Sequence, residues 1–129
     1  MVICRIIELI NLGKFGPHSR VVELFSCLAR DLELYVVVNM GSKRLKAGKE
    51  MHYNTDVTFN RSGHIVAIYD KRNLFTTEKE VFDTPKLEIT TFETEFGTFG
   101  LITCFDAMFE HPLIDLVDDK GSKKLDKNV

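Results

Sequence analysis

The feature that most constrains the fold is a helical pattern that leads directly into an uninterrupted apolar segment. Ser19 is placed to cap a helix, and the apolar residues that follow recur on one helix face: Val21, Leu24, Phe25, Leu28 and Leu32. The segment 34–38 reads Leu-Tyr-Val-Val-Val, which is typical of a strand covered on both faces. A helix followed by such a strand predicts an α/β protein with a layered architecture.

Further strands are predicted along the rest of the chain. Alternating apolar and polar residues over 53–59, turn residues at 60–63 and an apolar run at 65–69 predict a β-hairpin. The segments 87–92 and 98–105 predict a second pair of strands, and Pro112 is placed to open a short helix. We expect 42–50 to be an exposed loop with a solvated positive charge, and 72–86 to be a structured loop.

Composition excludes several classes of function. A length of 129 residues suits one modest domain, and 44% apolar with 28% charged residues is typical of a folded chain. The net charge is -2 and the signs are mixed throughout, so the sequence shows no basic patch of the kind that binds nucleic acid or an anionic membrane surface. No apolar run reaches the ~18 residues of a transmembrane helix. Arg5 and Glu8 interrupt the apolar N-terminal stretch, so a signal peptide is not predicted.

Cys104 and Lys71 are the residues whose positions suggest chemistry. Each is predicted at the end of a strand, where a side chain can be held rigidly at the rim of a sheet. A thiolate is a competent nucleophile, and a nearby helix N-terminus or ammonium group stabilises it. A lysine at such a rim can bind the oxyanion that develops on an attacked carbonyl. From the residues alone, a core thiol and a surface lysine remain the more common alternatives.

The other cysteines and the histidines do not indicate a metal site. Cys4, Cys27 and Cys104 lack CxxC spacing, and their odd number leaves one thiol free if a pair closes. Cys27 is interpreted either as a small core residue or as a disulfide partner. Three histidines fall in predicted loops or turns. His111 is interpreted either as a residue that approaches the cleft at Cys104 or as a cap of the short helix that follows it. We predict no metal and no cofactor.

Three stretches resemble the vanin/biotinidase branch of the carbon–nitrogen hydrolase (nitrilase) superfamily: FSCLARDLELYVVVNMGSK, YNTDVTFNRSGHIVAIYDKRNLF and FETEFGTFGLITCFDAMFEHP. Their order and spacing agree with the family, as does the separation of 33 residues between Lys71 and Cys104. The resemblance divides the chain into a divergent segment 1–14, a partial carbon–nitrogen hydrolase domain 15–117 and a polar tail 118–129, which we expect to be disordered.

The resemblance implies a four-layer αββα fold, present here as a partial nitrilase-like sandwich, and a Glu–Lys–Cys triad. Cys104 matches the nucleophile that forms a thioester with the acyl part of an amide substrate. Lys71 matches the triad lysine, which supports the tetrahedral intermediate. Glu78 matches a glutamate of the same loop and is expected to line the substrate site, with an ordinary loop ion pair as the alternative.

The sequence departs from the family at both ends. The family's general base lies in a Pro-Glu-Asp type of segment that has no counterpart here, since Glu8 is the only glutamate before the match begins at Phe15. The Pro-Thr-Ala-Trp wall segment is replaced by KGSKKLDKNV, and the chain has no tryptophan. The resemblance therefore predicts a pantetheinase-type hydrolase of small linear amides such as pantetheine, impaired by the missing base. The alternative is an inactive truncated fragment or a binding domain of the same family.

Three further expectations follow from the resemblance. Missing strands would leave sheet edges uncovered, which predicts self-association. Family members are secreted, so we expect an extracellular location and a glycan at the Asn60-Arg61-Ser62 sequon. Cys4 and Cys27 stand where the family has a disulfide near the SCLA segment.

Overall fold

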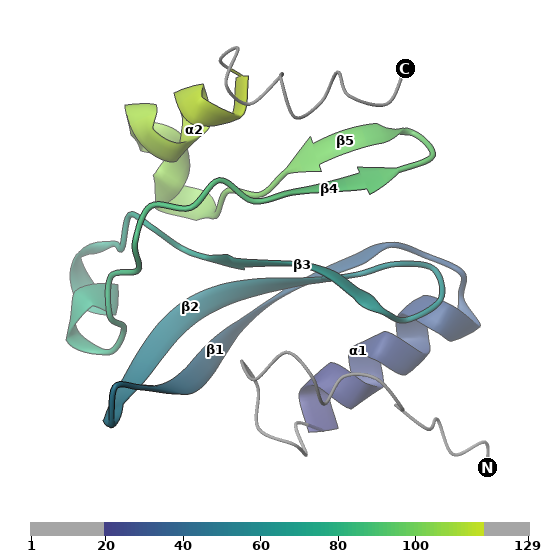
Figure 1. Ribbon diagram of the computed structural model, residues 1–129, viewed down its shortest axis with the longest axis horizontal. Helices are drawn as coiled ribbons and strands as arrows, with labels where there is room; N and C mark the ends of the chain where they lie inside the picture. Colours follow the sequence, from purple (N-terminus) through teal and green to yellow (C-terminus); the bar gives the residue numbers. More distant parts are fainter. Residues whose placement is uncertain (1–19, 118–129) are drawn as a thin grey trace.

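The structure is a computed structural model that describes residues 20–117 (Figure 1). Ser19, Cys4, the segment 1–14 and the tail 118–129 lie outside the described residues. Helix α1 (Arg20–Asp31) precedes an antiparallel sheet of order β1-β2-β3, formed by Val36–Lys46, Lys49–Phe59 and Ile65–Asp70. A hairpin of β4 (Thr91–Thr94) and β5 (Gly97–Gly100) and the helix α2 (Glu110–Val117) complete the fold. Short 3-10 helices span Thr76–Glu80 (η2) and Cys104–Met108 (η3).

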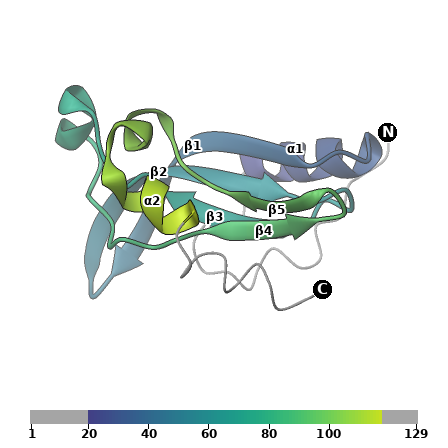
Figure 2. The same ribbon diagram turned by 90° about the horizontal axis from the view of Figure 1, so that it is seen from above.

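The elements form layers around the three-stranded sheet, which confirms the α/β fold class. Helix α1 covers one face of the sheet, and the β4–β5 hairpin runs alongside β3 on the other side (Figures 1 and 2). The first interface contains Val22 and Ala29 of α1 with Val57 and Phe59 of β2. On the opposite side the core residues are Ala67, Tyr69, Phe92 and Leu101. Within 20–117, no helix has the length and apolar character needed to cross a membrane.

The helix at 20–31 is confirmed, but the predicted buried face is wrong. Leu24 is 62% exposed, and Val21, Leu28 and Leu32 are exposed as well. The buried residues of α1 are Val22, Ser26 and Ala29. Small side chains let the helix approach the sheet closely, and Ser26 Oγ donates to the Gly63 carbonyl at 2.6 Å. Gly63 has a φ of 80°, and a Cβ at this position would lie 2.5 Å from the Ser26 carbonyl oxygen.

The expected loop at 42–50 is a second hairpin. Strand β1 runs on to Lys46 and β2 begins at Lys49, with only Ala47 and Gly48 between them. Both connecting residues have positive φ, 49° and 79°, as a tight hairpin turn with the twist of the strands requires. The cross-strand ion pair between Lys43 and Glu50 (2.7 Å) supports the register. The charges that suggested a loop lie along exposed strand positions.

Two other strand predictions need correction. The segment 34–38 is not covered on both faces, because Val37 is 49% exposed at the edge of the sheet. The second strand pair is shorter than expected, since 87–90 and 101–105 lie outside β4 and β5. A single hydrogen bond from the Leu101 amide to the Thr90 carbonyl (3.0 Å) extends the pairing beyond the strands. At the end of β5, Leu116 of α2 packs onto Gly100, and a Cβ at Gly100 would lie 2.6 Å from the Leu116 side chain.

Candidate active site

Lys71 is buried directly after β3, so the surface alternative is wrong. Its side chain is 1% exposed, and its Nζ donates to Glu78 Oε2 at 2.6 Å. Its amide donates to the Asn54 carbonyl at 2.8 Å, which anchors the backbone to β2. Burying an ammonium group is costly unless a counter-charge accompanies it. Glu78 supplies that charge here.

Glu78 collects hydrogen bonds on both carboxylate oxygens. Oε2 also accepts from the Phe75 amide at 2.7 Å, and Oε1 accepts from Asn54 Nδ2 at 2.9 Å. Burial acts to raise the pKa of Glu78, but the hydrogen bonds and charge of Lys71, with the Phe75 and Asn54 contacts, outweigh it. The pKa therefore lies below its ordinary value and the group is an anion at neutral pH. The ion pair with Lys71 is present, while the substrate-binding role stays a prediction.

Cys104 is an exposed free thiol at the start of η3, not a core residue. It lies four residues beyond the end of β5 rather than on the strand itself. Its φ is 48°, in the left-handed region that a residue with a Cβ occupies at a cost of about 1 kcal/mol. Strain of this kind persists where surrounding contacts impose it. For Cys104, the contacts that hold the turn are the hydrogen bonds made by Thr103 and Asp106 on either side of it.

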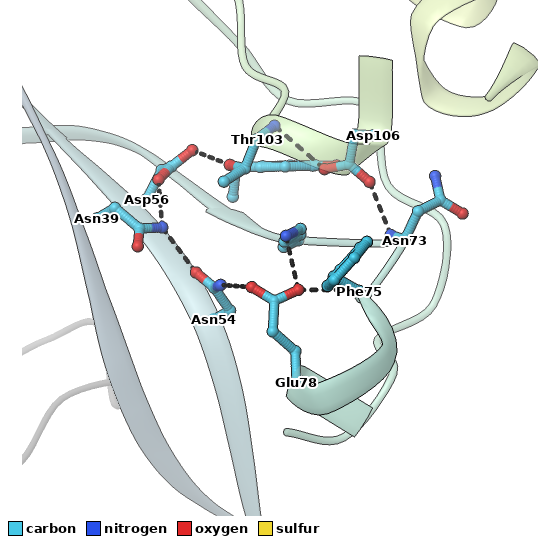
Figure 3. Close-up of polar contacts among 10 residues, drawn as sticks. Asn39, Asn54, Asp56, Asn73, Phe75, Glu78, Thr103 and Asp106 are labelled. Atoms are coloured by element: carbon cyan, nitrogen blue, oxygen red, sulfur yellow. Dashed lines mark hydrogen bonds and ion pairs between the residues drawn. The ribbon is translucent and has the colours of Figure 1, made fainter. Parts of the chain in front are cut away.

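Asp106 joins the Cys104 turn to the Lys71 segment. The Asp106 side chain is fully buried, and its Oδ2 accepts from the Tyr69 hydroxyl (2.8 Å) and the Thr103 amide (3.1 Å). Its Oδ1 accepts from the Asn73 amide at 2.7 Å. Tyr69 and Asn73 lie two residues before and after Lys71, so one carboxylate fixes both segments. Figure 3 shows the contacts of Asp106 with Thr103 and Asn73. Burial, followed by the hydrogen bond to Asp106, raises the pKa of Tyr69, which keeps the phenol protonated as a donor.

A second buried carboxylate, Asp56 of β2, holds the other side of the turn. Its oxygens accept from Thr103 Oγ1 and, at 2.8 Å, from Asn39 Nδ2. Asn39 Nδ2 also donates to Asn54 Oδ1 at 2.6 Å, and Asn54 continues to Glu78. Figure 3 shows Thr103 between the carboxylates of Asp56 and Asp106, with the Asn54–Glu78 contact below them. The hydrogen-bond network thus runs without interruption from the residue before Cys104 to the partner of Lys71.

One polar network, buried at Asp56 and Asp106 and more exposed at Asn39, connects the Cys104 turn to the Lys71 segment. Sequence reasoning missed the aspartates and asparagines that form it. Asn54, Asp56 and Thr58 were predicted only as the polar positions of an alternating strand. Every residue from Thr55 to Phe59 is buried, because layers cover both sides of β2. The signal available in the sequence was an acidic residue, Asp56, between two β-branched neighbours.

The other residues considered above lie apart from this network. The His111 ring contacts Asp115 at 2.7 Å, one turn along α2, and Cys27 is disulfide-bonded. Among the residues that the structure describes, no group of three His, Cys, Asp or Glu side chains is arranged to hold a metal ion. Asn60 Oδ1 accepts from the Ser62 and His64 amides (3.0 and 2.9 Å), within the β2–β3 turn. Glycosylation of Asn60 stays a prediction.

The amino-acid sequence is similar to those of known carbon–nitrogen hydrolases. A sequence profile described as carbon-nitrogen hydrolase matches residues 10–122. The chain is 44% identical to a pantetheinase of Sus scrofa and 43% identical to one of Homo sapiens, each over 118 residues. It is 38% identical to a biotinidase of Takifugu rubripes over 120 residues. Each match covers 84% of this chain but 23% of the relative, so the chain spans about a quarter of the length of these proteins.

A solved structure supports the fold independently. The crystal structure of a carbon-nitrogen hydrolase from Helicobacter pylori G27 superposes with a TM-score of 0.62 and 22% sequence identity. The superposition covers 81% of this chain and 32% of the other. The layered arrangement of helix and strands described above is therefore similar to part of the fold of that hydrolase.

Proposed function

The chain belongs to the carbon–nitrogen hydrolase family, and from this premise we propose that it carries the nucleophile and lysine of an amidohydrolase site. The observation that carries the proposal is that Asp106 ties the turn of the strained, exposed Cys104 to the segment that holds the buried Lys71 and its partner Glu78. In this proposal Cys104 is the nucleophile, Lys71 stabilises the tetrahedral oxyanion, and Glu78 orients Lys71 and lines the substrate site.

The proposed reaction has two steps. The Cys104 sulfur bonds to the carbonyl carbon of a linear amide, the carbon–nitrogen bond breaks, and the thiol proton leaves with the amine. Water then cleaves the thioester, which releases the carboxylic acid and restores the thiol. Lys71, held by Glu78, is the donor that we assign to the oxyanion formed in each step. Similarity to pantetheinases supports a small pantetheine-type amide as substrate.

We propose further that turnover by these 129 residues is slow. No segment of the chain matches the family's Pro-Glu-Asp base, and general acid–base catalysis typically contributes ~10²–10⁴-fold. A poor leaving group such as an amine must receive a proton before it can leave, whereas a good leaving group departs without one. With a good leaving group, acylation of Cys104 therefore depends less on the general base than hydrolysis of the acyl-enzyme does. We therefore expect an activated acyl donor to trap the acyl-enzyme.

The test is intact-mass analysis of the full chain after incubation with a pantothenoyl p-nitrophenyl ester. We expect one pantothenoyl adduct on the parent chain and none on Cys104→Ala, with little cysteamine released from pantetheine itself. An adduct that persists in Cys104→Ala contradicts the role of Cys104. Fast cysteamine release that depends on Cys104 contradicts the proposed impairment and leaves the nucleophile assignment intact.

A binding or assembly role is the second candidate, and exposed apolar side chains favour it. Leu24, Val37 and Leu45 are 62%, 49% and 78% exposed, and the outer edge of β1 has no partner strand within residues 20–117. We propose that these surfaces make the chain self-associate. Sedimentation velocity should show species larger than a monomer, and fewer of them for the edge variant Val37→Lys. A monomer at all concentrations contradicts the proposal.

A further inference from the structure

Asn39 of β1 is an exposed residue that contacts the network of the candidate active site. It lies directly opposite Asp56 in the register of β1 and β2, and Asn54 is the preceding residue on the same face of β2. The direct partner of Asn54 is Gly41, which has no side chain. The Asn39 side chain therefore reaches both Asn54 and Asp56, as Figure 3 shows.

A single nitrogen atom of Asn39 makes both contacts. Nδ2 donates to Asn54 Oδ1 at 2.6 Å and to Asp56 Oδ1 at 2.8 Å. An amide nitrogen carries two N–H donors, so both donors are used. Because an ionised carboxylate offers only acceptors, the contact with Asp56 determines which end of the Asn39 amide turns toward β2.

The orientation of the Asn54 amide follows from this contact. Its Oδ1 accepts from Asn39, so its Nδ2 points the other way and donates to Glu78 Oε1 at 2.9 Å. Glu78 in turn accepts from Lys71 Nζ through Oε2. If the Asn54 amide were turned round, its oxygen would face the Glu78 carboxylate, and two acceptors would meet without a proton between them.

The second contact of Asn39 leads toward the candidate nucleophile. Asp56 accepts from Asn39 on Oδ1 and from Thr103 Oγ1 on Oδ2, and Thr103 is the residue before Cys104. Asn39 thus lies where the branch toward Lys71 and the branch toward Cys104 meet. Because its side chain is exposed, its replacement leaves no buried cavity.

We propose that Asn39 is a positioning residue for the proposed hydrolysis. It sets the orientation of the Asn54 amide and holds Asp56 against the Cys104 turn, and so keeps the thiol and the lysine in a fixed relative placement. The effect on rate rests on the proposed function, whereas the effect on Asn54 does not. A misplacement of about 1 Å caused far from the reacting atoms can slow a reaction by ~10²-fold.

The test is Asn39→Asp in the full chain, which keeps the shape of the side chain and replaces its donor with an acceptor. The Asn54 amide should turn to donate to residue 39, so its side-chain NMR signals, assigned by their loss in Asn54→Ser, should shift. In single-turnover acylation by the pantothenoyl p-nitrophenyl ester, the maximal rate should fall about tenfold or more, at an unchanged half-saturating ester concentration. Unshifted Asn54 signals, a parental maximal rate, or a change confined to the half-saturating concentration overturns the proposal.

A second background separates positioning from a general loss of structure. In Glu78→Gln, the new side-chain amide can donate to the turned Asn54 oxygen, so Asn39→Asp should slow acylation several-fold less than in the parent. Equal losses in the two backgrounds mean that Asn39 does not act through Glu78, and they overturn the proposal. Lys43→Gln is the matched control, because Lys43 is exposed on the same face of β1 and pairs with Glu50. This variant should keep the parental rate and Asn54 signals.

The NMR measurement needs no ester, so the two proposals fail separately. If the parent is not acylated, or if the adduct persists in Cys104→Ala, the proposed hydrolysis is wrong. The Asn54 signals then still decide whether Asn39 sets the orientation of this amide.

Discussion

Replacing Asp106 with alanine is expected to destabilise the chain by about 3 kcal/mol or more, a large fraction of the ~5–15 kcal/mol typical of a domain. The change removes one acceptor and leaves three donors without a partner: the buried Tyr69 hydroxyl and the part-buried amides of Thr103 and Asn73. Water cannot replace the carboxylate easily, because the side chain has no exposed surface. Urea unfolding followed by circular dichroism measures the loss.

Asp31→Ala is the matched control for this prediction. Asp31 is an exposed carboxylate whose side chain is 61% accessible and contacts the adjacent Arg30. Exposed ion pairs contribute little, so this variant should unfold within about 0.5 kcal/mol of the parent. If Asp106→Ala unfolds at the same urea concentration as Asp31→Ala, the network around Asp106 does not hold the two segments together.

Replacing Lys71 with methionine is expected to slow acylation of Cys104 by ~10²–10³-fold, the typical effect of removing one oxyanion donor. Methionine keeps much of the length of the buried side chain but cannot donate to an oxyanion or pair with Glu78. A single-turnover measurement with the activated ester isolates acylation from the slow release step. The proposed role of Lys71 is wrong if the variant acylates as fast as the parent.

Two variants separate chemistry from folding in this experiment. Lys79→Met removes an exposed ammonium one residue from Glu78, and it should acylate at the parental rate. Glu78→Gln keeps Lys71 but weakens its orientation, so acylation should be slower than in the parent and faster than in Lys71→Met. Circular dichroism spectra of all variants must match the parent before rates are compared.

The pKa of Glu78 adds a pH dependence with a defined sign. Because its pKa in the folded chain is lowered, Glu78 contributes stability above the ordinary glutamate pKa of ~4.3, and this contribution is lost as the pH falls through the lower folded value. The difference in unfolding free energy between the parent and Glu78→Gln should therefore be largest near neutral pH and should shrink in acid. A constant difference would mean that the ion pair with Lys71 adds no net stability.

Local patterns in the chain were sufficient for several parts of the fold. The helix at 20–31, the hairpin between 53 and 69 and the turn at Gly63 follow from periodicity and turn chemistry over short distances. The hairpin at 42–50 was missed because Ala47 occupies a position with positive φ that Asn, Asp or Gly usually takes. Its alternating charges resemble those of a solvated loop.

The sequence by itself determined the fold class, the family, and the choice of Cys104, Lys71 and Glu78 as candidates for chemistry. Only the tertiary structure decided which face of α1 is buried, that β2 is covered on both sides, and that Asp56 and Asp106 connect the candidates. The physical reason is distance along the chain. The Tyr69–Asp106, Asn73–Asp106 and Thr103–Asp56 contacts join residues 37, 33 and 47 positions apart, and no local pattern encodes which distant layer will bury a polar side chain or pair with it.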